Sequence, residues 1–528
     1  MTNIRNKLIK ILIYCVLFFA TAAIIYNNMV ISPKYPLVYS QYNQSILYLI
    51  GRMIKSGKVP YIDVIDHKGI YVLLIHYLAA TIGENNHIGL FIIGVFSNFL
   101  SVVFIYKIII AISIEELKIS EKKNTTQNES NCKIFIIEIT AIFSSLLCVV
   151  LQSLYTISYG TLQSETFITT IIVVSIYYFI KDVINNNYEY KHTFLYGIMF
   201  STILFIKPNY NLFYLAIAIL ILRNSIKEKI INTISRHIVY GLIGIIAGAS
   251  IAIIYALANN NLKEMFYYTF TVNAIYSNAP YIGLNTKSES ILWTLSQFIH
   301  IYMIVLVGLI ILTIISIKLF DVKKNIYISL IPIAFLLIIS TLVSARNYSY
   351  YLLVLLPFIV IIFNELLKGI LSLTLRLNSI KYIIVSVLII FLTIFSINLS
   401  LKYGRDLMIK NGKDHLRVAS VVKDTYKNNV YGNRKNLLVL GSELYLYDYL
   451  GVLPSFKYFA VPMIGYEYYS EPYLETIQYI ESRKADILVL GLGAGLSEFY
   501  NNTNLVETIN SNYSLLSNTF GRQVFKLR

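Results

Sequence analysis

The sequence predicts an all-α polytopic membrane protein with a small α/β domain at its C-terminal end. Of its 528 residues, 56% are hydrophobic and only 14% are charged, whereas soluble domains carry about 25% charged residues. Several apolar segments reach the roughly 20 residues that a helix needs to cross a bilayer. Beyond about residue 401 the density of charged residues rises towards that of soluble proteins.

About eleven apolar segments have the character expected of membrane-spanning helices. Arg5, Lys7 and Lys10 precede the first of them and predict an uncleaved anchor with its N-terminus inside the cell. The expected helices lie near residues 8–30, 88–112, 134–154, 166–181, 193–206, 210–222, 237–257, 291–316, 326–343, 349–364 and 381–400.

If the N-terminus lies inside the cell and successive loops alternate between the two sides of the membrane, the basic residues fall mainly in the inner loops. The inner loops, which are rich in Lys and Arg, would be 113–133, 182–192, 223–236, 317–325 and 365–380. The outer loops, which are poorer in them, would be 155–165, 207–209, 258–290 and 344–348. This is the distribution that orients proteins in the cell membrane. The formal charge of +16 therefore indicates orientation and not nucleic-acid binding.

The first outer loop, residues 31–87, contains two short helical segments. Residues 43–56 place apolar side chains at the i, i+3, i+4 and i+7 positions of a one-sided helix. Residues 70–82 are apolar, but these 13 residues are too short to span. We expect both to lie on the outer face of the bilayer, with Arg52, Lys55 and Lys58 reaching the lipid head groups.

Residues 401–528 form the expected extracytoplasmic α/β domain, and residues 1–400 the transmembrane domain. Short β-like runs occupy 436–441, 485–491 and 523–527, between helical stretches near 413–428 and 471–484. The sequence GLGAG at 491–495 lacks the spacing of a dinucleotide-binding turn, because Leu496 stands in the last glycine position. The three cysteines, Cys15, Cys132 and Cys148, are no disulfide framework.

Few ionisable residues fall on the expected outer face. Such residues at membrane depth are candidates for function, because burying an isolated charge there is expensive. The segment VPYIDVIDHKG at 59–69 concentrates several of them directly after the amphipathic helix. The candidates are Asp63, Asp66, His67 and Lys68 in this segment, Glu165 in the next outer loop, Lys207 between two unusually short apolar segments, and Arg346 before the tenth helix.

Carboxylates and cations on one face fit the transfer of a sugar from a polyprenyl phosphate. A carboxylate takes the proton of the acceptor hydroxyl, and Lys and Arg hold the leaving phosphate. Simpler interpretations stay open. In these interpretations, Asp66 and Lys68 would form a solvated ion pair at the membrane interface. His67 would be a hydrogen-bonding surface residue, and Lys207 would extend from a short helix to the lipid head groups. His67 has no second His or Cys at ligand spacing.

At these residues the chain resembles the GT-C superfamily of membrane glycosyltransferases, specifically bacterial relatives of family 39, the protein mannosyltransferase and aminoarabinose transferase group. The stretch NQSIL…GRMIKSGKVPYIDVIDHKGI at 43–70 is similar to that group's D-S-S-x-F…P-Y-x-D-x-x-D-H-K-G-P pattern. GTLQSE at 160–165 and RNYSYY at 346–351 match two further family features loosely. The resemblance implies juxtamembrane helices in the first outer loop and, frequently, an extracytoplasmic C-terminal domain.

The resemblance also implies roles for these residues. It implies a polyprenyl-phosphate-linked sugar as the donor to an envelope glycan or lipid, and a base at position 43. Because Asn43 cannot take a proton, we expect Asp66 or Glu165 to act as base and Asn43 to orient a hydroxyl. No cofactor or metal is required, although Asp63 and Asp66 are able to bind a divalent ion. The residues expected to bind the substrate are Asp63, His67, Lys68, Lys207 and Arg346.

Departures from the family pattern leave two other functions open. Asn43 stands where relatives carry the acid presumed to be the catalytic base, Ile70 replaces a proline, and Ser164 replaces the first of two acids. A catalytically inactive relative that binds lipid-linked sugar or a partner enzyme is therefore the first alternative. A flippase for lipid-linked sugar is the second, but it would need charges along a path through the membrane, whereas the candidates gather on one face.

Overall fold

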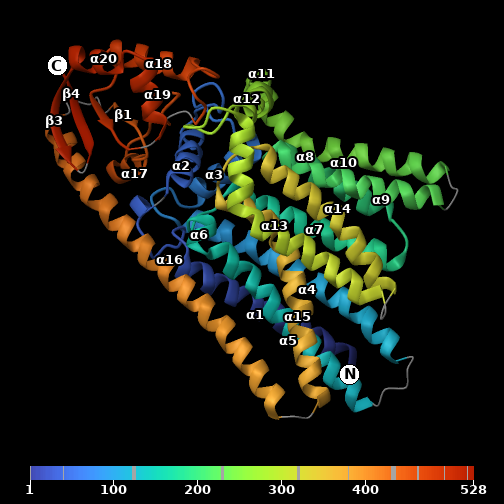
Figure 1. The fold of residues 1–528 in the computed structure, drawn as a ribbon. Coiled ribbons are helices and arrows are strands. Elements are labelled where there is room, and N and C mark those ends of the chain that lie inside the picture. The colour runs from blue at the N-terminus through green and yellow to red at the C-terminus, as the bar shows by residue number, and fades with distance from the viewer. Residues whose placement is uncertain are drawn as a thin grey trace.

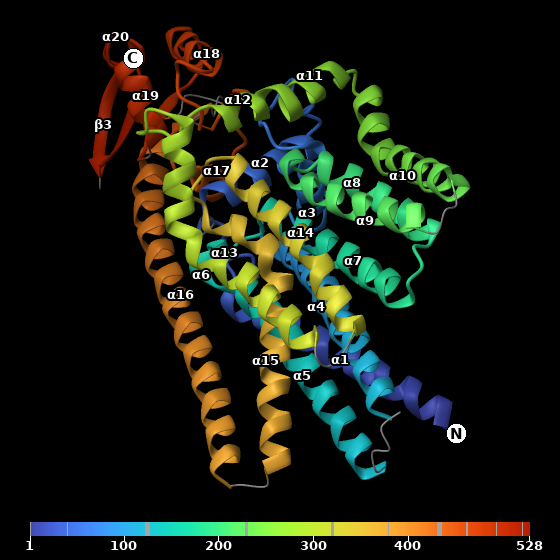
Figure 2. The ribbon, with the colours of Figure 1, turned by 45° about the vertical axis from the view of Figure 1, so that its right-hand side comes forward.

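The chain forms a bundle of long helices with a small α/β domain at one end (Figures 1 and 2). This computed structural model describes residues 2–39, 41–121, 127–227, 231–317, 321–377, 380–429, 436–460, 463–492, 494–519 and 521–528. The N-terminus lies at the end of the bundle far from the C-terminal sheet (Figure 1). Helices α8, α9 and α10 form a group at one side of the bundle (Figure 2).

The elements follow one another along the chain in an order that matches the expected two-part architecture. The helices of the first part are α1 (Thr2–Asn28), η1 (Leu37–Tyr39), α2 (Tyr42–Lys55), α3 (Ile70–Ile82), α4 (Ile88–Glu121), α5 (Gln127–Ser153), α6 (Tyr155–Ser158), α7 (Ser164–Asn185), α8 (Tyr190–Leu204), η2 (Pro208–Leu212), α9 (Phe213–Lys227), α10 (Ile231–Ala258), α11 (Leu262–Phe266), η3 (Tyr267–Val272), α12 (Asn273–Asn278), α13 (Lys287–Ile317), α14 (Asp321–Val343), η4 (Ser349–Leu355) and α15 (Leu356–Leu377). The remaining elements are α16 (Ile380–Asn429), β1 (Leu437–Leu440), α17 (Tyr445–Leu450), α18 (Glu471–Glu481), β2 (Ile487–Leu490), α19 (Ala494–Asn502), α20 (Leu505–Asn512), β3 (Tyr513–Thr519) and β4 (Arg522–Leu527).

The protein is a multi-pass membrane protein. Within the described residues, eight helical segments are long and apolar enough to cross a bilayer, and they correspond to eight of the expected helices. Two further expected helices are α8 and α9, which have 15 residues each. The last, 381–400, falls in α16, where the side chains of residues 372–396 lie outside the described part of the chain. The count of eleven therefore stays a prediction.

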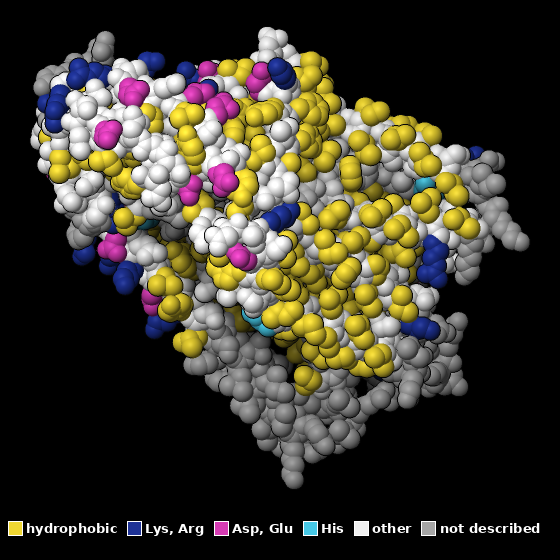
Figure 3. Space-filling view, turned by 45° about the horizontal axis from the view of Figure 1, so that its top comes forward, with side chains coloured by type: hydrophobic (Ala, Val, Ile, Leu, Met, Phe, Trp, Pro, Cys, Tyr) yellow, Lys and Arg dark blue, Asp and Glu magenta, His cyan; other side chains and the backbone are white. Residues whose placement is uncertain are grey.

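The outer surface of the bundle is hydrophobic, as contact with lipid requires. Ile246 and Ile254 of α10 are 70% and 64% exposed, and Leu292 of α13 is 63% exposed. Figure 3 shows a broad hydrophobic surface over the helices, whereas acidic and basic side chains gather over the C-terminal domain. In water such a continuous apolar surface would mark an interaction site; here its partner is the acyl region of the bilayer.

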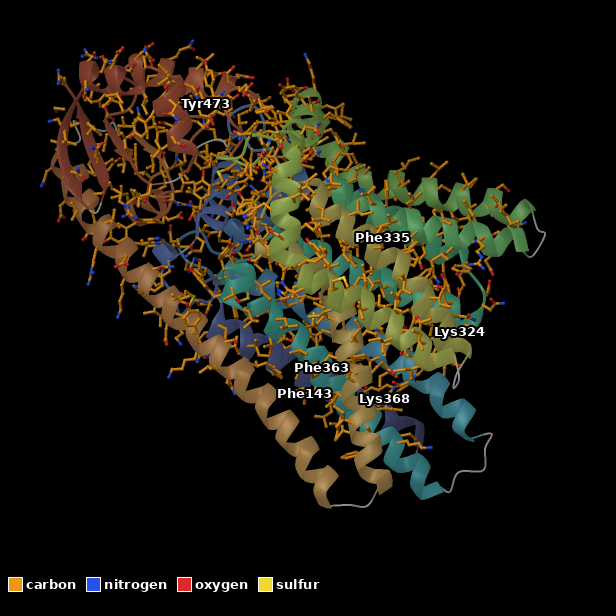
Figure 4. The ribbon with its side chains drawn as sticks, in the orientation of Figure 1. Phe143, Lys324, Phe335, Phe363, Lys368 and Tyr473 are labelled. Atoms are coloured by element: carbon orange, nitrogen blue, oxygen red, sulfur yellow. The ribbon has the colours of Figure 1, made fainter. Side chains whose placement is uncertain are left out.

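Close packing inside the bundle relies on small residues and on aromatic pairs. A Cβ atom on Gly197 of α8 would lie 2.3 Å from the carbonyl oxygen of Gly241 of α10, so only glycine permits this approach of the two helices. Phe143 of α5 faces Phe363 of α15, with ring centroids 6.2 Å apart (Figure 4). Lys368 near the end of α15 lies far from Tyr473 of the C-terminal domain (Figure 4).

The C-terminal domain contains a four-stranded sheet in the order β1-β2-β4-β3. β1 and β2 are parallel, while β4 pairs antiparallel with both β2 and β3. The three predicted strands are confirmed. β3 was not predicted, because its sequence YSLLSNT is polar at several positions. Among the described residues, the strand forms through backbone pairing with β4 alone. α16 runs without a break from Ile380 to Asn429, so the proposed boundary at residue 400 lies inside one helix.

The two short helices of the first outer loop are confirmed as α2 and α3, but one expectation about α2 is wrong. Arg52 does not extend to lipid head groups: its guanidinium donates to Asp448 of α17 across 2.6 Å, and both side chains are buried. The C-terminal domain covers this face of α2, which the sequence of the helix alone cannot reveal. Lys55 pairs with Glu84 at 2.7 Å, and Lys58 is exposed.

Candidate active site

The segment 59–69 is a rigid loop built on its own hydrogen bonds. Asp63 accepts a hydrogen bond from the backbone N–H of Val59 at 2.8 Å. Tyr61, which has a positive φ of 67°, donates its hydroxyl to the carbonyl oxygen of Lys68 at 2.7 Å. These contacts curl the chain so that Asp66, His67 and Lys68 project together. Asp63 shapes the loop and does not itself line the cavity described below.

This loop is joined to three other parts of the molecule. The N–H of Ile65 donates to the carbonyl oxygen of Lys457 in the C-terminal domain at 3.1 Å. Asn273 of α12 donates its side-chain amide to the carbonyl oxygen of His67. Gly69 donates to Ile206 at 3.1 Å, after α8, and a Cβ atom there would lie 2.0 Å from the carbonyl oxygen of Phe205. A glycine is therefore required where the loop meets the end of α8.

A cavity opens between this loop, the helix bundle and the C-terminal domain. It encloses about 1040 Å³ not filled by protein atoms, a volume that includes the open solvent at its mouth. Its lining residues are Tyr42, Asn43, Ile46, Ile65, Asp66, His67, Lys68, Gln163, Ser164, Glu165, Ile206, Lys207, Tyr268, Val272, Asn273, Tyr276, Tyr348, Tyr350, Tyr351, Tyr458, Ala460, Met463, Ile464, Tyr469 and Pro472.

The structure brings most of the predicted site residues to this one cavity although they come from distant segments. Asp63 and Arg346 are not among its lining residues. The six that line it are Asn43, Asp66, His67, Lys68, Glu165 and Lys207. Because Asp66 and Glu165 face the same cavity, the expectation that they lie on one side of the membrane agrees with the fold.

The first charged pair of the cavity is formed by Asp66 and Lys68. The Asp66 carboxylate accepts the backbone N–H of Lys68 at 2.7 Å, and the Lys68 ammonium lies 3.2 Å from it. Burial raises the pKa of Asp66, but Lys68, His67 and the Lys68 N–H together outweigh it and leave that pKa below its usual value. Asp66 is thus a carboxylate at neutral pH and a weak proton acceptor.

His67 is neutral at physiological pH. Burial lowers its pKa to about 4; the Asp66 carboxylate opposes this shift, and the charges of Lys68, Lys207 and Arg346 add to it. Its ring is stacked on Tyr276, with centroids 4.8 Å apart. A neutral imidazole in this position is able to form hydrogen bonds with a substrate without adding charge.

The second charged pair is formed by Glu165 and Lys207. Glu165 lies in the first turn of α7 and accepts the Lys207 ammonium at 2.7 Å and the Tyr210 hydroxyl at 3.3 Å. The Lys207 ammonium also lies 3.7 Å from the centre of the Tyr351 ring. Ion pairing and a cation–π contact therefore hold this partly exposed lysine at the cavity wall. Its ammonium is able to donate a further hydrogen bond to a ligand there.

Arg346 lies behind the cavity wall. Its guanidinium donates to the carbonyl oxygens of Tyr276 at 2.7 Å and Ala279 at 3.3 Å, at the C-terminal end of α12. It is also stacked over the Tyr276 ring at 4.2 Å. Arg346 thus fixes Tyr276, the ring on which His67 packs, and acts on the cavity through these neighbours.

Asn43 faces the cavity from the first turn of α2. Its side-chain amide donates to the Tyr350 hydroxyl at 3.2 Å. Tyr350 is itself stacked on Tyr348, with ring centroids 5.2 Å apart. The amide is therefore held in place by η4 and presents a fixed polar group, which has no acid–base function.

The cavity also contains residues that were not singled out from the sequence. They are the tyrosines of α2 and η3 and the residues of the C-terminal domain, exemplified by Tyr42, Tyr268, Tyr458 and Tyr469. The chain has 45 tyrosines, so composition offers no way to select these. The one local signal is the tyrosine run at 348–351, next to Arg346.

No group of three or more His, Cys, Asp or Glu side chains suited to a metal ion occurs among the residues that the structure describes. The charges of the cavity are instead arranged as two carboxylate–lysine pairs. Such an arrangement is able to bind an anion through the lysines and to accept a proton through a carboxylate.

Solved structures of ArnT and AglB align with nearly the whole chain. The structure of ArnT from Cupriavidus metallidurans bound to undecaprenyl phosphate aligns with a TM-score of 0.55 and 8% sequence identity, covering 97% of each chain. The apo state of the same ArnT aligns with a TM-score of 0.55 and 10% identity over the same shares. The archaeal oligosaccharyltransferase AglB from Archaeoglobus fulgidus, in complex with an inhibitory peptide and a dolichol-phosphate, aligns with a TM-score of 0.46 and 9% identity, covering 98% of this chain and 74% of its own. No protein-family profile and no curated protein sequence matches the chain.

Proposed function

The chain has the GT-C fold, and on that premise we propose that it transfers a sugar from a polyprenyl-phosphate donor to an acceptor in the cell envelope. The observation that carries this proposal is the pair of carboxylate–lysine contacts, Asp66–Lys68 and Glu165–Lys207, around one cavity. Sugar transfer needs cations for the departing phosphate and a base for the incoming hydroxyl. The proposed orientation is N-terminus inside, with the cavity and the C-terminal domain outside.

In the proposed complex, Lys207 and Lys68 bind the donor phosphate. Lys207 lines both the cavity described above and a second one, whose walls combine Pro208, Phe270 and Ala274 with Asn209, Asn273, Tyr276, Ser277 and Ser344. An ammonium that lines two adjoining spaces suits a phosphate that joins a sugar to a lipid tail. That an ArnT structure of the same fold has been solved with undecaprenyl phosphate supports a carrier of this class.

Glu165 is the better of the two candidate bases. Asp66 has a lowered pKa and accepts hydrogen bonds from the N–H and the ammonium of Lys68. It is therefore a weak base. A phosphate that draws the Lys207 ammonium away from Glu165 would leave that carboxylate without its counter-ion and readier to accept a proton. Donor binding would thereby prepare the base. His67, neutral and fixed on Tyr276, would orient the sugar.

A second candidate function is binding of lipid-linked sugar without transfer. It is favoured by Asn43, an amide that faces the cavity and cannot take a proton. In this case the two ion pairs would bind the phosphate, and no residue would activate the acceptor.

The test is complementation of a strain that lacks the gene. Cells are given radiolabelled sugar, and label in the envelope glycan and lipid fractions is compared between the wild-type gene and its variants. We expect Glu165→Gln to lower the gene-dependent label about a hundredfold or more and Asp66→Asn to lower it less. Glu84→Gln, which changes an acid of the first outer loop that does not line the cavity, is the matched control and should have no effect.

Wild-type levels of label in both Glu165→Gln and Asp66→Asn would overturn this site assignment. The variant Asn43→Asp separates the two candidate functions. A gene that yields no label until Asn43 becomes an acid would be a degenerate enzyme, and label already present with the wild-type gene would exclude the binding-only function.

A further inference from the structure

The cavity has two chemically different sides. The helix bundle and the first outer loop contribute all of its charged lining residues. Another part of the lining consists of uncharged side chains from η3 and the C-terminal domain, namely Tyr268, Val272, Tyr458, Ala460, Met463, Ile464, Tyr469 and Pro472. Aromatic rings line both parts, because Tyr276 stacks on His67 and Tyr351 lies against Lys207, whereas among the described residues charged side chains line only the part formed by the bundle and the loop.

Tyrosine is the only one of the three large aromatic residues in this lining. The lining residues within the described chain include eight tyrosines and no phenylalanine or tryptophan, although the chain has 28 phenylalanines against 45 tyrosines. A tyrosine offers a flat apolar face together with a hydroxyl that forms hydrogen bonds. The composition of the lining thus indicates a ligand that has apolar faces and polar edges.

The rings of the uncharged wall are held in place before any ligand binds. The hydroxyls of Tyr268 and Tyr458 lie 3.4 Å apart, and Tyr458 donates to a Glu471 carboxylate oxygen at 3.0 Å. Tyr61 of the rigid loop is stacked on Tyr268, with centroids 5.9 Å apart and planes 11° from parallel. Rings fixed in this way lose little freedom on binding, which favours affinity.

Tyr268 belongs to η3, a π-helical turn between α11 and α12. Such turns are rare and occur frequently at functional sites, because the extra residue redirects side chains. The adjoining Asn273 binds the His67 carbonyl oxygen, so the same segment touches the charged loop and the C-terminal domain.

We infer that the uncharged wall formed by Tyr268, Tyr458 and Tyr469 binds a neutral sugar ring of the acceptor, so that the acceptor is a glycan. A sugar ring has C–H faces that pack on aromatic rings and hydroxyl edges that bond to phenols. No Lys or Arg of this wall is among the described cavity-lining residues. Lys457, which lies over the Tyr458 ring at 5.0 Å, is paired with Glu475 at 2.8 Å, so within the described residues the wall offers no unpaired cation to the phosphate of a lipid head group. This inference rests on the proposed function, since it names the acceptor class for the same site.

The experiment measures sugar binding separately from donor binding, using the full-length protein in detergent. Saturation-transfer NMR with the methyl glycosides of glucose, galactose, mannose and N-acetylglucosamine reports sugar binding. Native mass spectrometry with undecaprenyl phosphate reports carrier binding. We expect at least one neutral glycoside to bind through its ring C–H protons, with about tenfold weaker binding to Tyr469→Ala and a smaller loss in Tyr458→Phe, which keeps the ring.

Tyr468→Ala is the matched control, because this neighbouring tyrosine is 44% exposed and does not line the cavity. It should bind the glycosides as the wild type does. Thermal unfolding of each variant shows that the fold is kept; if Tyr469→Ala fails to fold, Tyr458→Phe carries the comparison. The inference is overturned if no neutral glycoside binds the wild type, or if folded Tyr469→Ala and Tyr458→Phe bind it unchanged.

The two measurements keep the outcomes separate. Glycoside binding that depends on the tyrosines, without any binding of undecaprenyl phosphate, would contradict the proposed donor and leave the glycan site standing. Binding of undecaprenyl phosphate that is lost in Lys207→Met, without any glycoside binding, would contradict the inference alone.

Discussion

Lys207 contacts an acid, an aromatic ring and the ligand space at once. It pairs with Glu165 at 2.7 Å, lies over the Tyr351 ring at 3.7 Å, and lines both cavities. Lys68 has one ionic partner, Asp66 of its own loop. Because Lys207 joins helix α7 to the ligand space, its removal affects stability and binding together, and the two effects have to be separated.

Replacement of Lys207 by Met should lower stability and abolish carrier binding. Glu165, whose side chain is 2% exposed, would lose its counter-ion, at a cost of about 3 kcal/mol. The double variant Lys207→Met/Glu165→Gln should recover most of the unfolding midpoint without recovering binding of undecaprenyl phosphate. Recovery of binding in the double variant would show that Lys207 has only a structural role.

His67 should make stability depend on pH in a defined window. Its pKa falls from about 6.5 in the unfolded chain to about 4 in the folded protein. Between these values only the unfolded chain takes up the proton, so stability is complete above pH 6.5 and is lost as the pH falls towards 4. The difference amounts to at most about 3 kcal/mol.

The measurement compares thermal unfolding of wild type and His67→Gln from pH 4 to pH 8. The variant should lack part of the loss of stability below pH 6.5, and Tyr468→Ala, which removes no titrating histidine, serves as the control. Equal pH profiles for wild type and His67→Gln would contradict the neutral state of this partly buried imidazole.

At the scale of elements, α2 connects the two parts of the protein. Its first turn presents Asn43 to the cavity, and its last turns contact the C-terminal domain through the Arg52–Asp448 pair. Burial raises the pKa of Asp448 to about 6, although Arg52 opposes this shift. The helix that begins at the site is therefore held by an ion pair buried beneath α17.

Replacement of Arg52 by Met should loosen the C-terminal domain. Stability should fall by about 3 kcal/mol at pH 8, where Asp448 would be an unpaired buried anion, and by less at pH 5, where it takes up a proton. Limited proteolysis should then cut more rapidly within residues 436–460.

The double variant Arg52→Met/Asp448→Leu should recover stability, since it leaves no buried charge. Lys55→Met is the control, because its pair with Glu84 is about one-third exposed and worth about 0.5 kcal/mol. A loss in Lys55→Met as large as in Arg52→Met would contradict the special role of the buried pair.

At the scale of the whole molecule, the site exists because three chain regions meet at one end of the bundle. The first outer loop, the η3 segment and the C-terminal domain enclose the cavity, and α16 extends from the bundle to the sheet (Figures 1 and 2). The connection between α7 and α8 should therefore lie on the opposite side of the membrane from Lys58 and Tyr468.

Cysteine labelling in intact cells tests this sidedness. In a background without Cys15, Cys132 and Cys148, the variants Lys58→Cys and Tyr468→Cys should react with a membrane-impermeant maleimide. Asn187→Cys, exposed after α7, should react only after permeabilisation. Equal labelling of positions 58 and 187 in intact cells would exclude the proposed orientation.

The sequence alone determined the features that depend on local composition. Long apolar runs predicted eight of the spanning helices that the structure contains, because the bilayer imposes their length. The one-sided pattern of residues 43–56 and the 13 residues at 70–82 predicted α2 and α3. The charged residues of the cavity could also be predicted, because ionisable residues are scarce on the expected outer face of this chain.

The tertiary structure alone decided which of these side chains meet. Glu165 and Lys207 are 42 positions apart and Arg52 and Asp448 are 396 apart, and no local pattern pairs them. In the folded protein Asp63 and Arg346 do not line the cavity, whereas Tyr268, Tyr458 and Tyr469 do. The physical reason is that packing of distant segments, and not periodicity along the chain, sets where a side chain loses its water and which partner replaces it.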